Sequence, residues 1–401
     1  MNFDRIIDRT STNAAKWDSR TLKQKFGDSD VLPLWVADMD FASPDAVSEA
    51  LYKRADHQIY GYPASNAGFL KAWHKWVKSQ HKWDVPLNHA IYIPGIVSAM
   101  SLGISLFSEQ SDSVILQEPV YQPFRNMIIN NGRTPLVNRL ILRDGRYYID
   151  FKDLEEKAAL KETSLLLLCS PHNPGGRVWS REELEELSRI CLKHDVFVIS
   201  DEIHADLVLN EAKPHTALSS LSEKTARNTM TCQAPSKTFN IAGEKLAIAV
   251  LADKKKRERF FQELKRFSLS EGSALALTIG EAAYTRGGEW LTELKKYLNS
   301  NIGYIESYLK TELPEVNLMT PDAGFIGWLD FRNCGINHKE LEKRFIQIGK
   351  IALVEGRWFG EGGDGFFRLN YGCPRSLLEE GLKKLSASLT DDLIHKDSCS
   401  H

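Results

Sequence analysis

The stretch SLLLLCSPHNPGGRVWSREELEELSRICLKHDVFVISDE, residues 164–202, holds a strand, a helix and a second strand in immediate succession. Residues 164–170 are a short apolar run that ends in turn residues, which is typical of a buried strand. Residues 181–195 carry apolar side chains at helical spacing behind a serine that can cap the helix. Residues 196–200 form the second buried strand. Elements of these lengths predict a right-handed crossover between parallel strands.

The pattern continues on the C-terminal side of this unit. Residues 228–234 and 246–251 are further strand-like segments, so the centre of the chain is predicted to be an α/β sheet with helices on both faces. Over about residues 254–312 the pattern changes to long amphipathic helices. Short strands and one more helix follow, which predict a smaller α+β domain.

These segments predict four parts along the chain. An irregular N-terminal segment, residues 1–48, packs with the small domain. Residues 49–285 form the large α/β domain, and residues 286–390 form the small C-terminal α+β domain. Residues 391–401 are a polar tail.

Composition narrows the classes of protein. Apolar residues make up 42% of the 401 residues and charged residues 26%, as in globular proteins. Lys plus Arg is 51 and Asp plus Glu is 53, which argues against a nucleic-acid or membrane surface resting on a basic face. No apolar run is long enough to cross a bilayer, and we expect no export signal. Six scattered cysteines favour a reducing cytoplasm over disulfides or zinc.

Polar side chains follow three of the predicted strands at the point where each strand ends. Asn173 lies in the turn after the first strand, Asp201 directly follows the second, and Lys237 follows the third within APSKTFNIAG, residues 234–243. Ligands bind beyond the carboxyl ends of parallel strands, so we expect these side chains to face one site.

An amine, a carboxylate and an amide around one pocket predict a site for pyridoxal phosphate. A partly desolvated lysine amine such as that of Lys237 can form a Schiff base with an aldehyde. The pyridine ring withdraws electrons only when its nitrogen is protonated, and Asp201 can stabilise that charge. Asn173 can donate to the phenolate oxygen. In YIPGIVSAM, residues 92–100, a predicted helix starts after Pro-Gly, so the N–H groups of Ile96 and Val97 can bind the phosphate.

Six ordered motifs carry a family resemblance that runs from about residue 3 to 389. APSKTFNIAG resembles the lysine segment of fold-type I, class I/II pyridoxal-phosphate enzymes. The other five resemble the MalY/PatB-type cystathionine (cysteine-S-conjugate) β-lyases; in chain order they are LPLWVADMDF, EPVYQPF, SPHNPGGRVW, DEIHADL and FRLNYGCPR. The resemblance implies a fold-type I enzyme with a mostly parallel sheet. It also implies a homodimer whose active sites are shared across the interface.

The resemblance assigns roles to residues of this chain. Catalytic roles fall to Lys237, Asp201 and Tyr121, with Tyr121 stacked on the pyridine ring. The implied cofactor-binding residues are Ile96, Val97, Tyr121, Asn173, Asp201, His204, Ser236, Lys237, Lys245 and, from the neighbouring subunit, Tyr62. The implied substrate-binding residues are Ala37, Tyr121, Asn173 and Arg368, whose guanidinium suits the α-carboxylate.

Some positions leave alternatives open. Lys245 stands where relatives commonly carry a phosphate-binding arginine, and it can contact phosphate or pair with Glu244. Gly324 replaces a larger expected residue and either widens the pocket or eases a strand bend. His204 stands where many relatives carry tyrosine, and a hydrogen-bonded core histidine is its alternative. Arg368 can instead form a structural ion pair.

The acidic residues of DEIHAD do not predict a metal site. Adjacent side chains of an extended segment point to opposite faces, so Asp201 and Glu202 should diverge. No other metal-ligand spacing accompanies them.

We predict a cytoplasmic enzyme that cleaves the Cβ–S bond of cystathionine or cysteine S-conjugates to a thiol, pyruvate and ammonia. An aminotransferase that uses the same residues with a 2-oxo acid is the alternative. A binding or regulatory protein that has kept the fold is a rival from another class, but it would be expected to have lost Lys237, Asp201 or Arg368, and all three are present.

Overall fold

The computed structural model describes residues 1–390, so the predicted polar tail, residues 391–401, lies outside the described residues. A seven-stranded sheet forms the centre of the molecule, in the order β2-β10-β9-β8-β7-β3-β4. Its strands are β2 Ala90–Ile93, β3 Ser113–Leu116, β4 Thr134–Val137, β7 Thr163–Cys169, β8 Phe197–Asp201, β9 Thr229–Gln233 and β10 Ala247–Leu251. Pairing is parallel from β9 to β4, and β10 is antiparallel to both of its neighbours. The predicted crossover is confirmed by the parallel pair β7 and β8.

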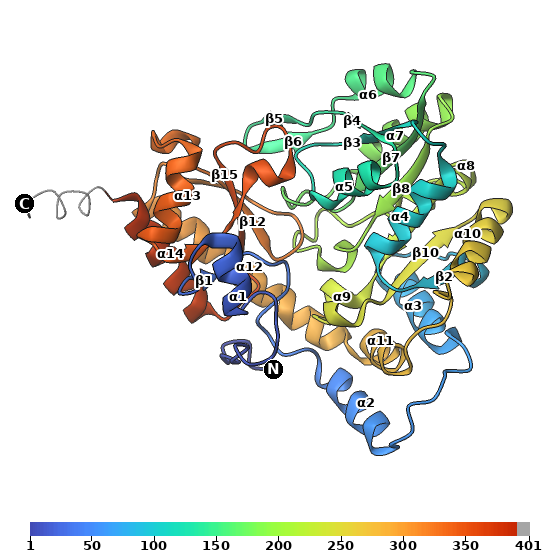
Figure 1. The fold of residues 1–401 in the computed structure, drawn as a ribbon, viewed down its shortest axis with the longest axis horizontal. Helices are drawn as coiled ribbons and strands as arrows, with labels where there is room; N and C mark the ends of the chain where they lie inside the picture. The colour runs from blue at the N-terminus through green and yellow to red at the C-terminus, as the bar shows by residue number, and fades with distance from the viewer. Residues whose placement is uncertain (391–401) are drawn as a thin grey trace, which may run out of the picture.

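Helices cover both faces of this sheet (Figure 1). The helices are α1 Ser19–Phe26, α2 Asp45–Asp56, α3 Ala67–Gln80, α4 Ile96–Phe107, α5 Pro123–Asn130, α6 Phe151–Ala158, α7 Arg181–Lys193, α8 Glu223–Arg227, α9 Pro235–Thr238, α10 Lys254–Arg266, α11 Ala274–Arg286, α12 Gly288–Glu312, α13 His338–Gln347 and α14 Arg375–Leu389. Short 3-10 turns are η1 Leu87–His89, η2 Ala205–Leu207, η3 Leu218–Ser220, η4 Ala242–Glu244, η5 Arg332–Cys334 and η6 Gly356–Phe359.

The alternation of side chains in β7 explains why its sequence is apolar throughout. Leu165 and Leu167 belong to one hydrophobic cluster, which includes Phe260 of α10, while Leu166 and Leu168 belong to a second cluster on the other face. A strand covered on both faces has no polar side, and so it reads as a continuous apolar run. The helix that follows begins at the predicted cap: Ser180 and Glu183 form a capping box.

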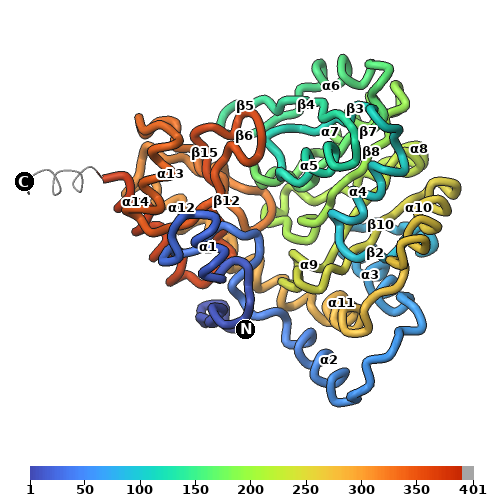
Figure 2. Tube along the Cα trace, in the orientation of Figure 1, coloured from blue at the N-terminus to red at the C-terminus, as the bar shows by residue number. Residues whose placement is uncertain are grey.

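A four-stranded antiparallel sheet, β11-β12-β15-β14, forms the second centre. Its strands are β11 Asn317–Met319, β12 Ile326–Asp330, β14 Val354–Glu355 and β15 Phe366–Asn370. Beside it, β1 Leu32–Pro33 pairs in parallel with β13 Ile351–Ala352, which links the N-terminal segment to the C-terminal part of the chain. A two-stranded hairpin, β5 Ile141–Arg143 with β6 Arg146–Tyr148, completes the strands. Figure 2 shows the blue N-terminal trace lying against the orange and red C-terminal elements.

The expectation of an irregular N-terminal segment is wrong at three places: the helix α1, the short strand β1 and the start of α2 at Asp45. Residues 19–26 form the helix α1, capped by Asp18 and ended by Gly27 in the left-handed conformation. This helix has eight residues and only Leu22 is buried, so its apolar periodicity is too short to read from the sequence. Among residues 1–390, no helix combines the length and the apolar character needed to cross a membrane.

Candidate active site

A cavity of about 380 Å³ opens where the carboxyl ends of β8 and β9 meet the N-terminus of α4. Ten of the residues predicted for the site line it: Ala37, Ile96, Val97, Tyr121, Asn173, Asp201, His204, Ser236, Lys237 and Lys245. The volume lies within the range of small-molecule sites. The structure therefore brings together residues that are up to 208 positions apart in the chain, from Ala37 to Lys245.

Lys237 lies on α9, a single helical turn that directly follows β9. Its Nζ donates a hydrogen bond to the carbonyl oxygen of Ala37. Burial lowers the pKa of this amine to about 8; the charge of Asp38 opposes the shift and that of Arg368 adds to it. An amine with this pKa is partly neutral near pH 8, which is the state that a nucleophile or a general base requires.

Asp201 is the last residue of β8 and is 7% exposed. Burial raises the pKa of its carboxyl to about 7, and the backbone N–H of Ile203, 3.1 Å from Oδ1, partly opposes the shift. In the part of the chain that the structure describes, no lysine, arginine or histidine forms an ion pair with it. A buried carboxylate in this state favours a ligand that brings a positive charge.

The raised pKa of Asp201 predicts a pH-dependent stability of the ligand-free protein. In the unfolded chain the carboxyl ionises near 3.8, whereas in the folded chain it ionises near 7. The folded state thus loses stability as pH rises between these values, and the full penalty, on the order of a few kcal/mol, is present above pH 7. Asp201→Asn should raise Tm at pH 8 and have little effect at pH 4, as measured by thermal unfolding. An equal effect at both pH values would contradict the assigned burial cost.

Arg368 lies on β15 and is 5% exposed; it does not line the cavity itself but contacts Asn173, which does. Its Nη1 donates to Oδ1 of Asn173 at 3.2 Å, and its Nη2 donates to the carbonyl oxygen of Trp35 at 3.0 Å. Its Nε has no partner, and no carboxylate among residues 1–390 pairs with it. Burial lowers the pKa of the guanidinium to about 10. The structure therefore does not support the alternative of a structural ion pair. The guanidinium of Arg368 can bind the carboxylate of a ligand.

Asn173 and Tyr121 are held together at one wall of the cavity. The backbone N–H of Tyr121 donates to the carbonyl oxygen of Asn173 at 3.2 Å. Because Oδ1 of Asn173 accepts from Arg368, its Nδ2 remains as a donor toward the cavity. Burial raises the pKa of the Tyr121 phenol, so the ring is neutral. Both positions agree with the predicted roles, which stay predictions.

His204 lines the cavity and is 4% exposed. Burial lowers the pKa of its imidazole to about 3, and Nδ1 has no hydrogen-bond partner. The alternative of a histidine satisfied by core hydrogen bonds is thus not what the structure shows.

Gly324 lies next to His204, and a Cβ at Gly324 would stand 3.8 Å from Nδ1 of that histidine. With φ at +92°, Gly324 has a backbone conformation that disfavours any side chain, which explains the departure at this position.

The N-terminus of α4 forms the opposite wall. Gly95 precedes it with φ of +96°, and no side chain caps the helix, so its first N–H groups face the cavity beside Ile96 and Val97. Ser236 is buried in the same lining. Lys245 also lines the cavity, and no ion pair joins it to Glu244 in the described part of the chain. An anion would find both amides and a cation here.

Tyr62, like Arg368, is a predicted site residue that does not line the cavity of its own chain. Its side chain is 97% exposed, on the loop between α2 and α3. That loop projects from the body of the molecule in Figure 1. The predicted role assigns Tyr62 to a neighbouring subunit, and its exposure is consistent with that role.

Two asparagines position the site and were not predicted. Asn240 bonds the backbone of Met39 in both directions at 3.0 Å, which ties the lysine segment to the N-terminal segment. Asn370 donates to the carbonyl oxygens of Val36 and Asp38. Both asparagines lie inside motifs noted above, so their place within two or three residues of Lys237 or Arg368 was the available signal.

The expected divergence of Asp201 and Glu202 is present. Glu202 points away from the cavity, where its Oε2 meets Nε2 of His215 at 2.9 Å and accepts from Nε2 of Gln233 at 3.1 Å. The two carboxylates therefore do not share a ligand, in agreement with the argument against a metal site in this segment.

Known proteins resemble this chain over nearly its whole length. Cystathionine beta-lyase PatB of Bacillus subtilis is 45% identical and covers 97% of this chain and 100% of its own. The structure of cystalysin from Treponema denticola, which contains pyridoxal 5'-phosphate, has a TM-score of 0.92 at 35% identity, over 97% of this chain and 98% of its own. A PLP-bound putative aminotransferase from Clostridium difficile has a TM-score of 0.94 at 37% identity, over 97% and 100%.

The predicted family and the fold-type I architecture are confirmed by these similarities. A family description, "Aminotransferase class I and II", matches residues 29–385, from within the N-terminal segment to the last helix. The chain belongs to the class I and II aminotransferase family.

Proposed function

We propose that this chain is a pyridoxal-phosphate-dependent C–S β-lyase that converts cystathionine or cysteine S-conjugates to a thiol, pyruvate and ammonia. The carrying observation is a set of three charged groups at one cavity: Lys237 and Asp201 line it, Arg368 contacts its lining residue Asn173, and none of the three forms an ion pair among residues 1–390. The similarity to a cystathionine β-lyase over the whole chain supports the reaction class.

The residues present fit the cofactor. A partly buried lysine amine with a pKa of about 8 suits the aldehyde. The carboxyl of Asp201, whose pKa burial raises to about 7, suits a cationic ring nitrogen, which would lower that pKa again. Uncapped N–H groups at the start of α4, with Ser236 and Lys245 nearby, suit a phosphate. Each part of the cofactor thus has a complementary group in the cavity.

Bound pyridoxal phosphate supplies an electron sink for the negative charge that develops at Cα of the substrate. The residues of this chain do the rest. Arg368 binds the α-carboxylate and so orients the Cα–H bond. Lys237, as the free amine, removes the Cα proton and acts as general base. Tyr121 and Asn173 border the same space and exclude water from it.

One assay separates the lyase from the aminotransferase. Purified enzyme is incubated with cystathionine in the absence of any 2-oxo acid, and pyruvate and homocysteine are measured. Equal amounts of both, many times the amount of enzyme, support the lyase. Turnover that needs an added 2-oxo acid and yields a new amino acid would reject it. The two reactions share every step through removal of the Cα proton, so this test carries more weight than further sequence comparison.

We also propose a homodimer in which Tyr62 binds the phosphate of the neighbouring site. Since Tyr62 does not line the cavity of its own chain, its replacement can change cofactor affinity only through a second copy. Tyr62→Phe should raise the dissociation constant of the cofactor about 10-fold, the worth of one hydrogen bond to a charged group. Tyr60→Phe, on the same exposed loop, is the matched control. An unchanged affinity in Tyr62→Phe, or a monomer by light scattering, would refute the shared site.

Two further proposals concern organisation and location. The division at residues 285/286 is supported by the break at Gly287 between α11 and α12, after which α12 packs against β11 and α14.

A cytoplasmic location is supported by the cysteines, because all five in the described residues are free thiols. The sixth, Cys399, lies outside the described residues.

A further inference from the structure

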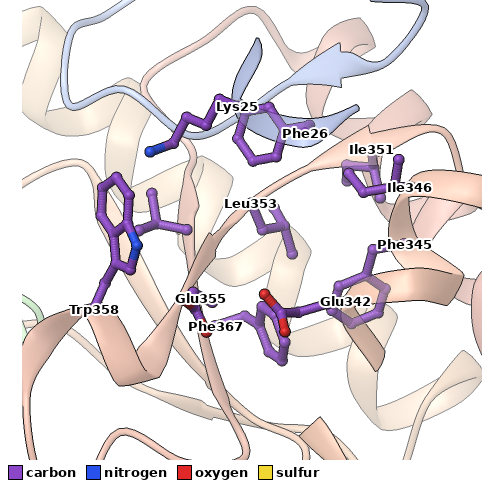
Figure 3. Close-up of a pocket in the computed structure, with 11 residues that line it drawn as sticks. Lys25, Phe26, Glu342, Phe345, Ile346, Ile351, Leu353, Glu355, Trp358 and Phe367 are labelled. Atoms are coloured by element: carbon purple, nitrogen blue, oxygen red, sulfur yellow. The ribbon is translucent and has the colours of Figure 1, made fainter. Parts of the chain in front are cut away.

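A second pocket, separate from the active-site cavity, lies between α1 and the C-terminal part of the chain (Figure 3). Its volume is about 110 Å³. Its apolar lining comes from α1, α13, β13, β15 and the residue between β13 and β14, and the main side chains are Phe26, Phe345, Ile346, Ile351, Leu353 and Phe367. Nothing in the proposed reaction uses this pocket.

One side of the pocket carries a cation that has no ion pair among residues 1–390, although the charge of Glu355 partly opposes the lowering of its pKa. Nζ of Lys25 lies 3.2 Å from the ring centroid of Trp358 and 4.9 Å from that of Trp35. No hydrogen bond or ion pair reaches this ammonium among residues 1–390. Burial lowers its pKa to about 8. Aromatic faces stabilise a cation only in part, so Lys25 would gain from a carboxylate.

The opposite side carries two carboxylates with free oxygens. Arg357 donates to Oε2 of Glu342 at 2.8 Å and to Oε2 of Glu355 at 3.2 Å. Within the described ranges no hydrogen bond uses either Oε1. Burial raises the pKa of Glu342, and the charge of Glu355 adds to the shift. In Figure 3 the carboxylate of Glu342 lies over Phe367, across the pocket from the nitrogen of Lys25.

These carboxylates and His338 also lie close enough together to suggest a metal ion, since their ligand atoms are within 4.8 Å of one another. The hydrogen bonds argue otherwise. Nδ1 of His338 accepts from the backbone N–H of Gly365 at 2.8 Å, so the proton of the neutral ring is on Nε2, which faces Oε2 of Glu355 at 3.2 Å. A metal ion binds a histidine nitrogen that carries no proton, and Nε2 of His338 carries one. A ligand ammonium binds the carboxylates and does not need that nitrogen.

A cation, a pair of carboxylates and an apolar floor are complementary to one class of molecule. We propose that this pocket binds a free α-amino acid, with its carboxylate at Lys25 and its ammonium at Glu342 and Glu355. At roughly 30 Å³ for each water-sized group, the cavity holds about four heavy atoms, as many as the side chain of leucine or methionine, so only that side chain fits inside it. Trp35 connects this pocket to the active site. Its ring contacts the ammonium of Lys25, and its carbonyl oxygen accepts a hydrogen bond from Arg368.

Calorimetric titration with L-leucine tests the proposal, because leucine has no leaving group at Cβ. Besides any binding at the active site, we expect a binding event in the holoenzyme that is weakened at least about 10-fold in Lys25→Met and in Glu342→Gln, as each removes a charge-assisted contact. Lys23→Met, an exposed lysine on the same helix, is the matched control and should bind as the native chain does. 4-Methylpentanoic acid, which is leucine without the ammonium, should bind more weakly than leucine.

The active site can also bind an amino acid, so Arg368→Ala is titrated in parallel. Binding that persists in Arg368→Ala and is lost in Lys25→Met places leucine in the second pocket. The proposal would be overturned if binding were lost in Arg368→Ala but kept in Lys25→Met and Glu342→Gln. It would also be overturned if leucine did not bind at millimolar concentration, or if its binding required an added divalent ion. Both pocket variants change partly exposed side chains, and circular dichroism checks that they fold. The result is independent of the cystathionine assay, which reports on the first cavity.

Discussion

Lys237→Ala is expected to abolish turnover of cystathionine and the visible absorption of the bound cofactor. The variant loses the only amine on α9 and with it the general base, which alone is worth about 10²–10⁴-fold in rate. Because the amine also holds the aldehyde, we expect a loss of at least about 10⁴-fold. The measurements are pyruvate formation and the absorption spectrum after addition of pyridoxal phosphate.

Lys245→Ala is the matched control for this experiment. Lys245 lines the same cavity but is exposed and lies beside the uncapped start of α4. Its loss should weaken cofactor binding about 10-fold as a charge-assisted contact, while the visible absorption returns at saturating cofactor. If Lys237→Ala kept normal turnover, or if Lys245→Ala removed the absorption permanently, the lysine roles would be reversed or wrong.

Arg368→Ala is expected to lower kcat/KM by about 10²–10³-fold, since two charge-assisted hydrogen bonds to a carboxylate are lost. The absorption of the bound cofactor should be unchanged. Arg368→Lys should recover part of the loss, because an ammonium keeps the charge but not the planar fork. Initial rates over a range of cystathionine concentrations provide the measurement.

Thermal unfolding separates this effect from a structural one. The guanidinium of Arg368 is buried, its pKa is lowered to about 10 by burial, and it has no carboxylate partner among residues 1–390. Its charge therefore costs folding free energy, and its removal is not expected to lower Tm by more than a few degrees, despite the lost bonds to Asn173 and Trp35. A low kcat/KM together with a large drop in Tm would point to a structural role instead.

The cavity itself was largely predictable. Asn173, Asp201 and Lys237 each follow a strand of the parallel sheet, and the rule for parallel sheets brings such positions to one edge. The sequence predicted the helix cap at Ser180. It did not predict the second hydrogen bond of the capping box, which the side chain of Glu183 accepts from the backbone N–H of Ser180. Helix α1 was missed because an eight-residue helix with one buried side chain has too little periodicity to detect.

The state of the charged groups could not be read from the chain. Neither the pKa of about 7 for Asp201 nor the unpaired Nε of Arg368 follows from sequence, because both depend on which atoms surround the group after folding. The pairing of Lys245 could not be read from the sequence either. Its neighbour Glu244 could have formed an ion pair with it, but no such pair is present among residues 1–390. The pocket at Lys25 and Glu342 was invisible too, since its walls come from segments about 320 residues apart.

Local order along the chain determined the strands, the crossover, the helix caps and the identity of the residues that carry the chemistry, because backbone propensity and apolar periodicity act over a few neighbouring residues. Tertiary structure alone decided which charges are buried without a partner, where Arg368 meets Asn173, and that a second charged pocket exists. Burial and long-range contact set these properties, since the energy of a charge depends on its whole surroundings rather than on its sequence neighbours.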